Sequence, residues 1–175
     1  MRKIFVIIIL VAVSAIFMLL KGKGNSPVEG DSIKISSLYL HPTTNPGSTF
    51  NLLDPYTKLS IVFGSPLNVK TEFSEMYDGN VTQYEFEGVN ASYFEGHAIS
   101  NQIKKATVSL GIVGAGSIKI GDSINKLEAI FPNSLALKKD GQIFVSILTP
   151  SGEVSDSFLV FDYDANNVVT SIIIN

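Results

Sequence analysis

Apolar positions recur at helical spacing in two short segments that match each other. Residues 54–63 (DPYTKLSIVF) and 122–131 (DSINKLEAIF) align without a gap, and the aspartate, the Lys-Leu pair and the last phenylalanine are identical. The spacing predicts two short helices with one apolar face each, capped by their leading aspartates and ended before Pro66 and at Pro132. Such internal similarity indicates a duplicated unit. The side chains expected to face a sheet are Leu59, Val62, Phe63, Leu127, Ile130 and Phe131.

Alternating patterns after each segment predict strands. Residues 81–87 place Thr82, Tyr84 and Phe86 on one face and acidic residues on the other. The sequence therefore predicts an α+β fold of two tandem helix-plus-antiparallel-sheet repeats, with the helices packed on one face of the sheet. Further strands, rich in β-branched and aromatic residues, are expected at 106–110, 143–148, 158–163 and 168–174.

The repeats are expected to occupy residues 32–111 and 112–175. Each contains the letters Ser-Ile-Lys-Ile near its start, at 32–35 and 117–120. The first repeat also carries an insert at 41–53, which contains prolines and a glycine and is expected to form a loop. Because functional residues are often placed on loops of a rigid frame, this insert is a candidate part of a binding surface.

Residues 1–20 are expected to be a signal peptide or a membrane anchor. The chain is apolar from Ile4 to Leu20 apart from one serine, and two basic residues precede this run. As a helix it would span roughly 26 Å, slightly less than a bilayer core. Small residues at 13–15 would suit cleavage, whereas the lysines after the run would suit an anchor, so both alternatives remain. Either one predicts an extracytoplasmic, for example periplasmic, location, with residues 21–31 as a flexible tether.

Composition limits the classes of partner. There is no cysteine, which excludes both a lipid-anchored cysteine and disulfides. After residue 25 the chain has nine lysines and sixteen acidic residues, a net charge of −7. Nucleic-acid binding needs clustered cations and is therefore not expected. The expected partner is another protein of the cell envelope that is basic at its contact.

Catalytic motifs are weak, so no enzyme, cofactor or metal site is expected. A Gly-Asp-Ser start, as at 121–123, resembles that of one serine-hydrolase family, but neither His41 nor His97 lies in the Asp-x-x-His pattern that the triad would need. Residues 162–167 resemble the opening of a calcium loop without its glycine and its final glutamate. The asparagines there are better explained by a hairpin turn.

An acidic, aromatic stretch is the best candidate for a binding surface. Residues 72–95 contain six acids, no lysine or arginine, and six interleaved aromatic residues. Aromatic side chains framed by charge are typical of protein interfaces, although a half-buried sheet with a solvated acidic face produces the same pattern. The candidate binding residues are Tyr77, Tyr84, Glu85, Phe86, Glu87, Tyr93 and Phe94.

The helix end Lys58-Leu59-x-x-Val62-Phe63-Gly64-x-Pro66 resembles that of the SmpA/OmlA small lipoproteins and of the β-lactamase inhibitory proteins. The resemblance covers about half of each repeat. It implies helix-on-sheet units, in tandem in the inhibitors, and a non-catalytic binding role. The lipidated cysteine of the first family and the disulfides of the second are absent here, and no site residue carries over.

These observations predict an exported, non-catalytic binding or inhibitory module of the cell envelope. The alternative is a structural or assembly component of the envelope that is held by its N-terminal segment. A hydrolase with an unrecognised site is the third class.

Overall fold

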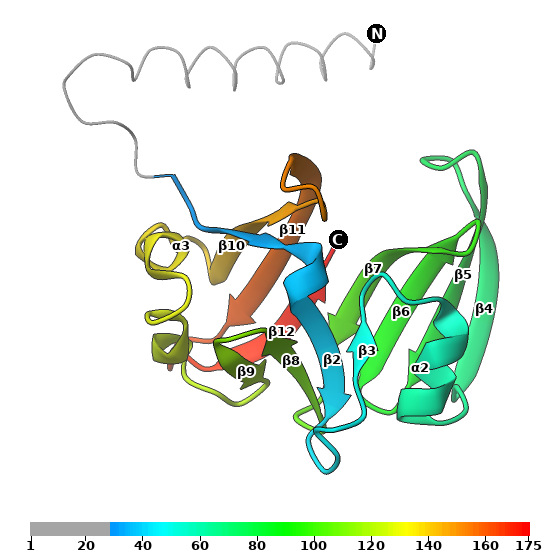
Figure 1. Ribbon diagram of the computed structural model, residues 1–175, viewed down its shortest axis with the longest axis horizontal. Helices are drawn as coiled ribbons and strands as arrows, with labels where there is room; N and C mark the ends of the chain where they lie inside the picture. The colour runs from blue at the N-terminus through cyan, green and yellow to red at the C-terminus, as the bar shows by residue number, and fades with distance from the viewer. Residues whose placement is uncertain (1–28) are drawn as a thin grey trace, which may run out of the picture.

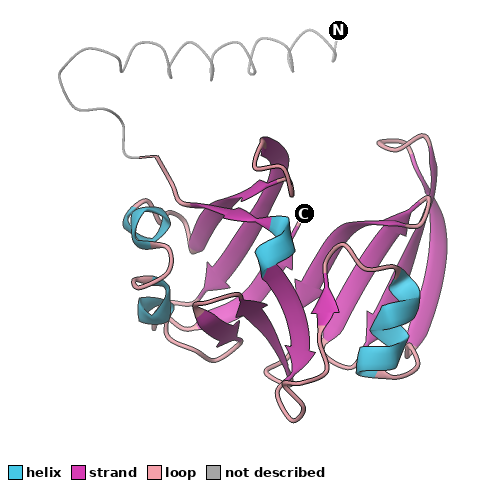
Figure 2. Ribbon diagram, in the orientation of Figure 1, coloured by secondary structure: helices cyan, strands magenta, loops and turns pink. Residues whose placement is uncertain are grey.

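The computed structural model describes residues 29–175, which form a mostly β architecture of two sheets (Figures 1 and 2). The predicted signal or anchor and most of the tether lie outside the described residues. The strands are β1 (Ser32–Lys34), β2 (Leu38–Pro42), β3 (Phe50–Asn51), β4 (Asn68–Ser74), β5 (Gly79–Phe86), β6 (Val89–Phe94), β7 (His97–Ile103), β8 (Val108–Ile112), β9 (Gly116–Lys119), β10 (Gln142–Leu148), β11 (Val154–Tyr163) and β12 (Val169–Ile174).

The larger sheet has eight strands in the order β1-β10-β11-β12-β7-β6-β5-β4. All neighbours are antiparallel except β1 and β10, which are parallel. The two halves of this sheet meet where β12 pairs with β7, and this joint contains only three residue pairs, from Ile172 with Ile103 to Ile174 with Asn101. The two halves of the large sheet are thus joined by a short pairing, as short as that of β1 with β10 at the edge.

The smaller sheet has four strands in the order β3-β2-β8-β9 and is built from two antiparallel hairpins. Its central strand β8 is buried along its whole length. Gly111 in β8 lies against the Tyr39 ring, and a Cβ atom at this position would come within 2.2 Å of that ring. Glycine is needed here because the backbone of β8 approaches the aromatic ring so closely.

One continuous core joins the two sheets. Inward-facing side chains of the large sheet, such as Phe161 and Ile172, belong to the same buried cluster as Leu40 and Leu110 of the small sheet. The alternation of buried and exposed positions in β10 follows the period of two expected for a sheet that packs on one face. The apolar residues that the composition supplies are thus buried between sheets, with helices at the periphery (Figure 2).

The predicted α+β fold of two helix-plus-sheet repeats is wrong. The described residues contain two short α-helices, α2 (Tyr56–Phe63) and α3 (Pro132–Ala136), beside two continuous sheets that each draw strands from both halves of the chain. The two Ser-Ile-Lys-Ile segments also differ, because the first contributes β1 to the large sheet and the second contributes β9 to the small one. Strand pairing between distant segments, which local patterns do not encode, decided the architecture.

The helix predicted at 54–63 is present as α2, with Leu59 buried against the core. The helix predicted at 122–131 is wrong: this segment forms a single 3-10 turn, η2 (Ile124–Leu127), and Pro132 begins α3 instead of ending a helix. A proline disfavours helical backbone at the residue before it, and Phe131 accordingly has φ −133° and ψ 59°.

The insert at 41–53 is not simply a loop. Its ends form part of β2 and β3, which pair as a hairpin, and a further 3-10 turn, η1 (Ile35–Ser37), precedes β2. Pro42 is tolerated because it is the last residue of its strand. Among residues 29–175, no helix combines the length and the apolar character needed to cross a bilayer.

Candidate functional site

Three of the seven predicted binding residues pack beneath α2. Tyr84 stacks on Tyr56 of the helix with ring centroids 5.0 Å apart, and Phe86 lies 6.4 Å from Phe63. Tyr93 meets Tyr84 edge to face at 5.8 Å, and both Phe86 and Tyr93 are buried. These rings hold α2 on the sheet. The alternation in residues 81–87 puts Tyr84 and Phe86 on one face, which is the face that α2 covers.

Burial sets the chemistry of Tyr93. Its hydroxyl has no hydrogen-bond partner, and burial, with smaller contributions from Tyr84 and Asp54, raises the pKa of Tyr93 above its ordinary value. The pKa of Tyr84 is raised for the same principal reason, desolvation. Both phenols are therefore neutral at physiological pH, and neither is suited to act as a general base.

The two predicted glutamates are exposed but do not act together. Glu85 lies on β5 opposite Asn68 and Asn90, on the face that is turned away from α2. Glu87 lies in the turn after β5 and forms an ion pair with Lys105 at 2.6 Å. The acidic face expected from alternation therefore includes Glu85, whereas Glu87 is paired with a lysine of the β7–β8 loop.

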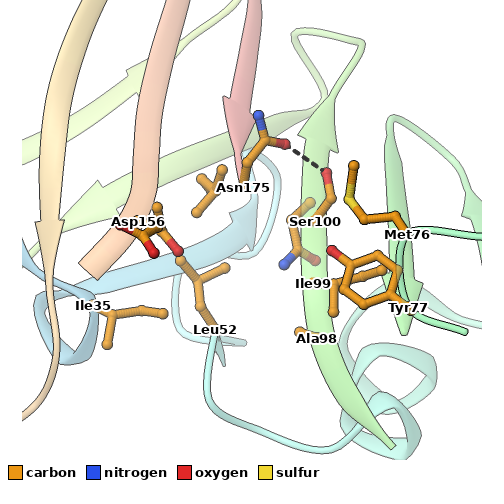
Figure 3. Close-up of a pocket in the computed structure, with 12 residues that line it drawn as sticks. Ile35, Leu52, Met76, Tyr77, Ala98, Ile99, Ser100, Asp156 and Asn175 are labelled. Carbon is orange, nitrogen blue, oxygen red and sulfur yellow. Dashed lines mark hydrogen bonds between the residues drawn. The ribbon is translucent and has the colours of Figure 1, made fainter. Parts of the chain in front are cut away.

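The remaining pair, Tyr77 and Phe94, lies at the edge of a cleft. Their rings stack at 5.2 Å, and Tyr77 comes from the β4–β5 turn. Together with Met76, Tyr77 covers one side of a hollow of about 470 Å³ near the middle of the large sheet (Figure 3). We call this hollow the central cleft; its lining residues are Ile35, Leu52, Met76, Tyr77, Ala98, Ile99, Ser100, Asn101, Asp156, Ser157, Ile174 and Asn175.

The central cleft lies between the N-terminal parts of β7 and β11, next to the last residues of β12. β12 pairs with β7 from Ile172 with Ile103 to Ile174 with Asn101, and residues 97–100 of β7 lie beyond this pairing. On the other side, Phe158 of β11 exchanges backbone hydrogen bonds with Asn175, and residues 154–157 of β11 lie beyond this contact. The two strands diverge on either side of the cleft (Figure 1).

Strand edges facing such a gap carry backbone groups that a further strand could pair with. Neighbouring strands lie about 4.8 Å apart, so the base of the central cleft beside β7 has the width of one strand. Ser100 donates a hydrogen bond to Oδ1 of Asn175 at 3.0 Å, which marks this base (Figure 3). The floor is apolar and consists of Leu52, Ile35 and Ile174.

Asn101 is the most deeply buried polar side chain of the cleft. This side chain is only 3% exposed, lines the cleft and has an amide oxygen with no hydrogen-bond partner. A buried acceptor without a partner is destabilising by roughly 1–3 kcal/mol, and such groups are uncommon in folded proteins. The Asn101 oxygen is itself buried, so a donor that enters the cleft would reach it once the side chain turns toward the cleft.

The surroundings of the cleft are acidic. Asp156 is its charged lining residue, and an adjoining groove that shares Met76, Tyr77, Ile99 and Ser100 adds Glu72. Neither lining contains a lysine or arginine. The local field thus favours a ligand that carries positive charge.

The second hollow that matters lies around His41, and it does not assemble a hydrolytic site. This hollow of about 290 Å³ brings His41 near Ser109, Ser117 and one carboxylate, Asp122. That carboxylate already accepts hydrogen bonds from the Lys119 backbone N–H at 3.0 Å and from Lys126 Nζ at 2.9 Å. Nδ1 of His41 faces the Pro42 carbonyl oxygen at 3.1 Å and has no carboxylate to orient it.

The acidic and histidine side chains of the described residues lie too far apart for a metal site. Within residues 29–175, no three His, Asp or Glu side chains are grouped so that they could hold a metal ion. In the segment that resembles a calcium loop, Asp164 Oδ1 accepts hydrogen bonds from the backbone N–H groups of Asn166 and Val168. These bonds close the predicted hairpin turn, with Asn167 at φ 60°.

No protein-family model matches the chain, and no curated protein or solved structure matches it either. The resemblance to the SmpA/OmlA lipoproteins and the β-lactamase inhibitory proteins stays a prediction from the sequence.

Tyr77 was among the predicted binding residues, whereas the other residues that line the cleft were not predicted. Asn101 and Asp156 belong to β7 and β11, and Asn175 follows β12, so only the strand register brings them together. One local signal existed: Asn101 occupies an inward position of β7, two residues before the buried Ile103. A polar residue at an inward strand position is a sign of either a hydrogen-bonded core or a site.

Proposed function

We propose that the protein is a non-catalytic binding module whose central cleft takes an extended, basic segment of a partner protein. The unpartnered amide oxygen of Asn101 carries this proposal, because it is a buried acceptor in an otherwise apolar floor. Binding sites combine apolar walls with a few such polar groups. A backbone N–H of the partner would satisfy Asn101 and remove its desolvation penalty.

The shape of the gap favours an extended segment over a compact ligand. Residues 97–100 of β7 lie beyond the pairing with β12 and beside the cleft, and addition of a strand to an open sheet edge is a common mode of peptide recognition. Leu52 and Ile174 would contact alternate apolar side chains of the segment. Lysine or arginine side chains between them would lie near Asp156 and Glu72.

Location is part of the same proposal. The basic start and apolar run of residues 1–20 support export, either with cleavage or with retention as an anchor. The partner would then be another protein of the cell envelope. N-terminal sequencing of the protein recovered from membrane and soluble extracytoplasmic fractions distinguishes the two forms, and full-length protein in the cytoplasm would contradict export.

A structural or assembly role in the envelope is the second candidate. Its supporting observation is that Tyr84, Phe86 and Tyr93 pack against α2 and the core, so that much of the acidic, aromatic stretch has a folding role. Under this alternative the central cleft would bind no peptide.

Peptide binding by the full-length protein in mild detergent tests the proposal. The probe is a fluorescent, capped peptide of alternating valine and lysine, and the comparison peptide has glutamate in place of lysine. We expect the lysine peptide to bind with an affinity that falls as salt is added, because screening weakens its attraction to the acidic rim. Equal binding of both peptides, or of neither, would contradict the proposal.

Asn101→Leu separates a binding role from a folding role. Leucine has a similar size and removes the buried acceptor, so the free energy of unfolding should be unchanged or higher. Peptide affinity should fall about tenfold with the loss of one hydrogen bond. For the rim, Asp156→Lys should weaken binding, whereas Asp140→Lys, the same charge change in an exposed turn outside the cleft, should not.

A further inference from the structure

Strand β4 forms one outer edge of the large sheet and is unusually open. It pairs with β5 on one side only, and residues 68–73 are all exposed. Val69 and Phe73 lie on the same face of the strand and are 51% and 63% exposed. Long, apolar edge strands with free backbone groups are sites of strand-to-strand association.

Most of the usual protective features of an edge strand are missing from β4. Its seven residues contain no proline or glycine, and their register with β5 runs without a bulge from Asn68 to Ser74. Its two charged residues, Lys70 and Glu72, form an ion pair with each other on the face opposite Val69 and Phe73. They therefore leave no net charge on the strand to repel a second edge.

The sequence of β4 is complementary to itself about its central residue, Thr71. In an antiparallel pair centred on Thr71, each Lys70 lies opposite Glu72 of the other strand, and each Val69 lies opposite Phe73. Opposite charges and apolar or aromatic pairs at directly opposed positions both stabilise a sheet. We propose that β4 pairs with β4 of a second copy of this chain across a two-fold axis at Thr71, which joins the two large sheets edge to edge.

The sequence of β4 also favours this antiparallel pairing over a parallel pairing and over a pairing shifted by one residue. A parallel pairing in register would place lysine beside lysine and glutamate beside glutamate. A shift of one residue would place the apolar residues of one strand on the polar face of the other. The antiparallel pairing about Thr71 is closed and symmetric, so association stops at a dimer instead of continuing into a fibre. No residue of β4 lines the central cleft, although Glu72 and Phe73 also line the adjoining groove. The pairing of two β4 strands does not depend on the function proposed for the cleft.

Cysteine crosslinking tests the register directly, because the chain has no cysteine. In the proposed dimer the two Thr71 Cα atoms lie about 4.5–5.5 Å apart, a separation that a disulfide can bridge. The two Val69 positions lie four residues out of register, roughly 13 Å apart, and cannot be bridged. On mild oxidation of the full-length protein in detergent, Thr71→Cys should give a covalent dimer and Val69→Cys should give essentially none.

Sedimentation over a range of protein concentration tests the charges. Glu72→Lys should weaken dimerisation about tenfold, because it sets lysines against lysines at both symmetric positions. The double variant Lys70→Glu/Glu72→Lys restores opposite charges and should dimerise like the unchanged protein. Glu128→Lys, the same charge change at an exposed residue outside β4, is the matched control and should have no effect.

Each other outcome overturns the proposal. A protein that remains monomeric at all concentrations has no such interface. A dimer in which Thr71→Cys crosslinks no better than Val69→Cys, or in which the double variant is as weak as Glu72→Lys, uses another surface or another register. Circular dichroism of each variant verifies that a lost dimer is not a lost fold.

Discussion

The matching segments 54–63 and 122–131 begin in the same way and end differently. In each, the leading aspartate accepts a hydrogen bond from the backbone N–H three residues earlier: Asp54 from Asn51 at 2.8 Å and Asp122 from Lys119 at 3.0 Å. Each aspartate also pairs with the lysine four residues later, at 2.7 Å and 2.9 Å. In both cases the aspartate thus fixes the turn between an edge strand of the small sheet and the following helical turn.

The segments diverge after their buried leucines, Leu59 and Leu127. The first continues as a helix until Gly64, whose φ of 83° ends it. The second stops after one 3-10 turn, because Pro132 follows directly after Phe131 and excludes helical backbone there. The shared letters therefore encode the turn, while the position of a proline decides whether a helix follows.

The largest difference between the segments is expected at their last phenylalanines. Phe131 is 2% exposed and packs near Phe161, whereas Phe63 is half-buried at the end of α2. Phe131→Ala should lower the free energy of unfolding by about 3–5 kcal/mol, and Phe63→Ala by about half as much. Urea denaturation of both variants measures this, and equal losses would contradict the unequal burial.

The aspartates should behave alike. Asp54→Ala and Asp122→Ala each remove an acceptor for a backbone N–H and should each lower the free energy of unfolding by about 1 kcal/mol. Lys58→Ala and Lys126→Ala remove only exposed ion pairs and should lower it by less than about 0.5 kcal/mol. If the lysine variants lose as much as the aspartate variants, the ion pair and not the backbone contact stabilises the turn.

Pro132→Ala tests whether the proline alone shortens the second segment. Alanine permits helical backbone at Phe131, so η2 and α3 could join and far-ultraviolet circular dichroism should show more helix. The free energy of unfolding should change by less than about 1 kcal/mol, because Pro132 has no backbone donor to lose. An unchanged spectrum would mean that packing, and not the proline, interrupts the helix.

The smallest effect concerns a third aspartate turn, at Asp164. Hydrogen bonds from backbone N–H groups, that of Val168 first, hold the pKa of Asp164 below its ordinary value. A carboxyl whose pKa is lowered on folding stabilises the protein above its unfolded pKa of about 4, and this contribution is lost as the pH falls through the folded pKa. Denaturation of Asp164→Asn should show a small loss at pH 7 that shrinks as the pH falls below about 4.

Local patterns in the sequence were sufficient for α2, for β5 and for the turn at Asp164. They could not predict that β1 pairs with β10, or that β2 and β8 lie side by side, because these contacts join distant residues. The central cleft depends on the same information, because its lining comes from β7, β11 and β12 as their register brings them together. Without that register, the sequence marks Asn101 only as a polar residue at an inward strand position.

The parallel pairing of β1 with β10 has a consequence for when this protein can fold. β1 is reinforced by Asp31, which accepts a hydrogen bond from the Ser134 backbone N–H, 103 positions further along the chain. A ribosome must therefore have made most of the chain before the first strand can find its partner. Folds with such distant contacts form slowly, in milliseconds to seconds. During synthesis the N-terminal strand therefore stays unpaired until residues 146–148 of β10 have been made.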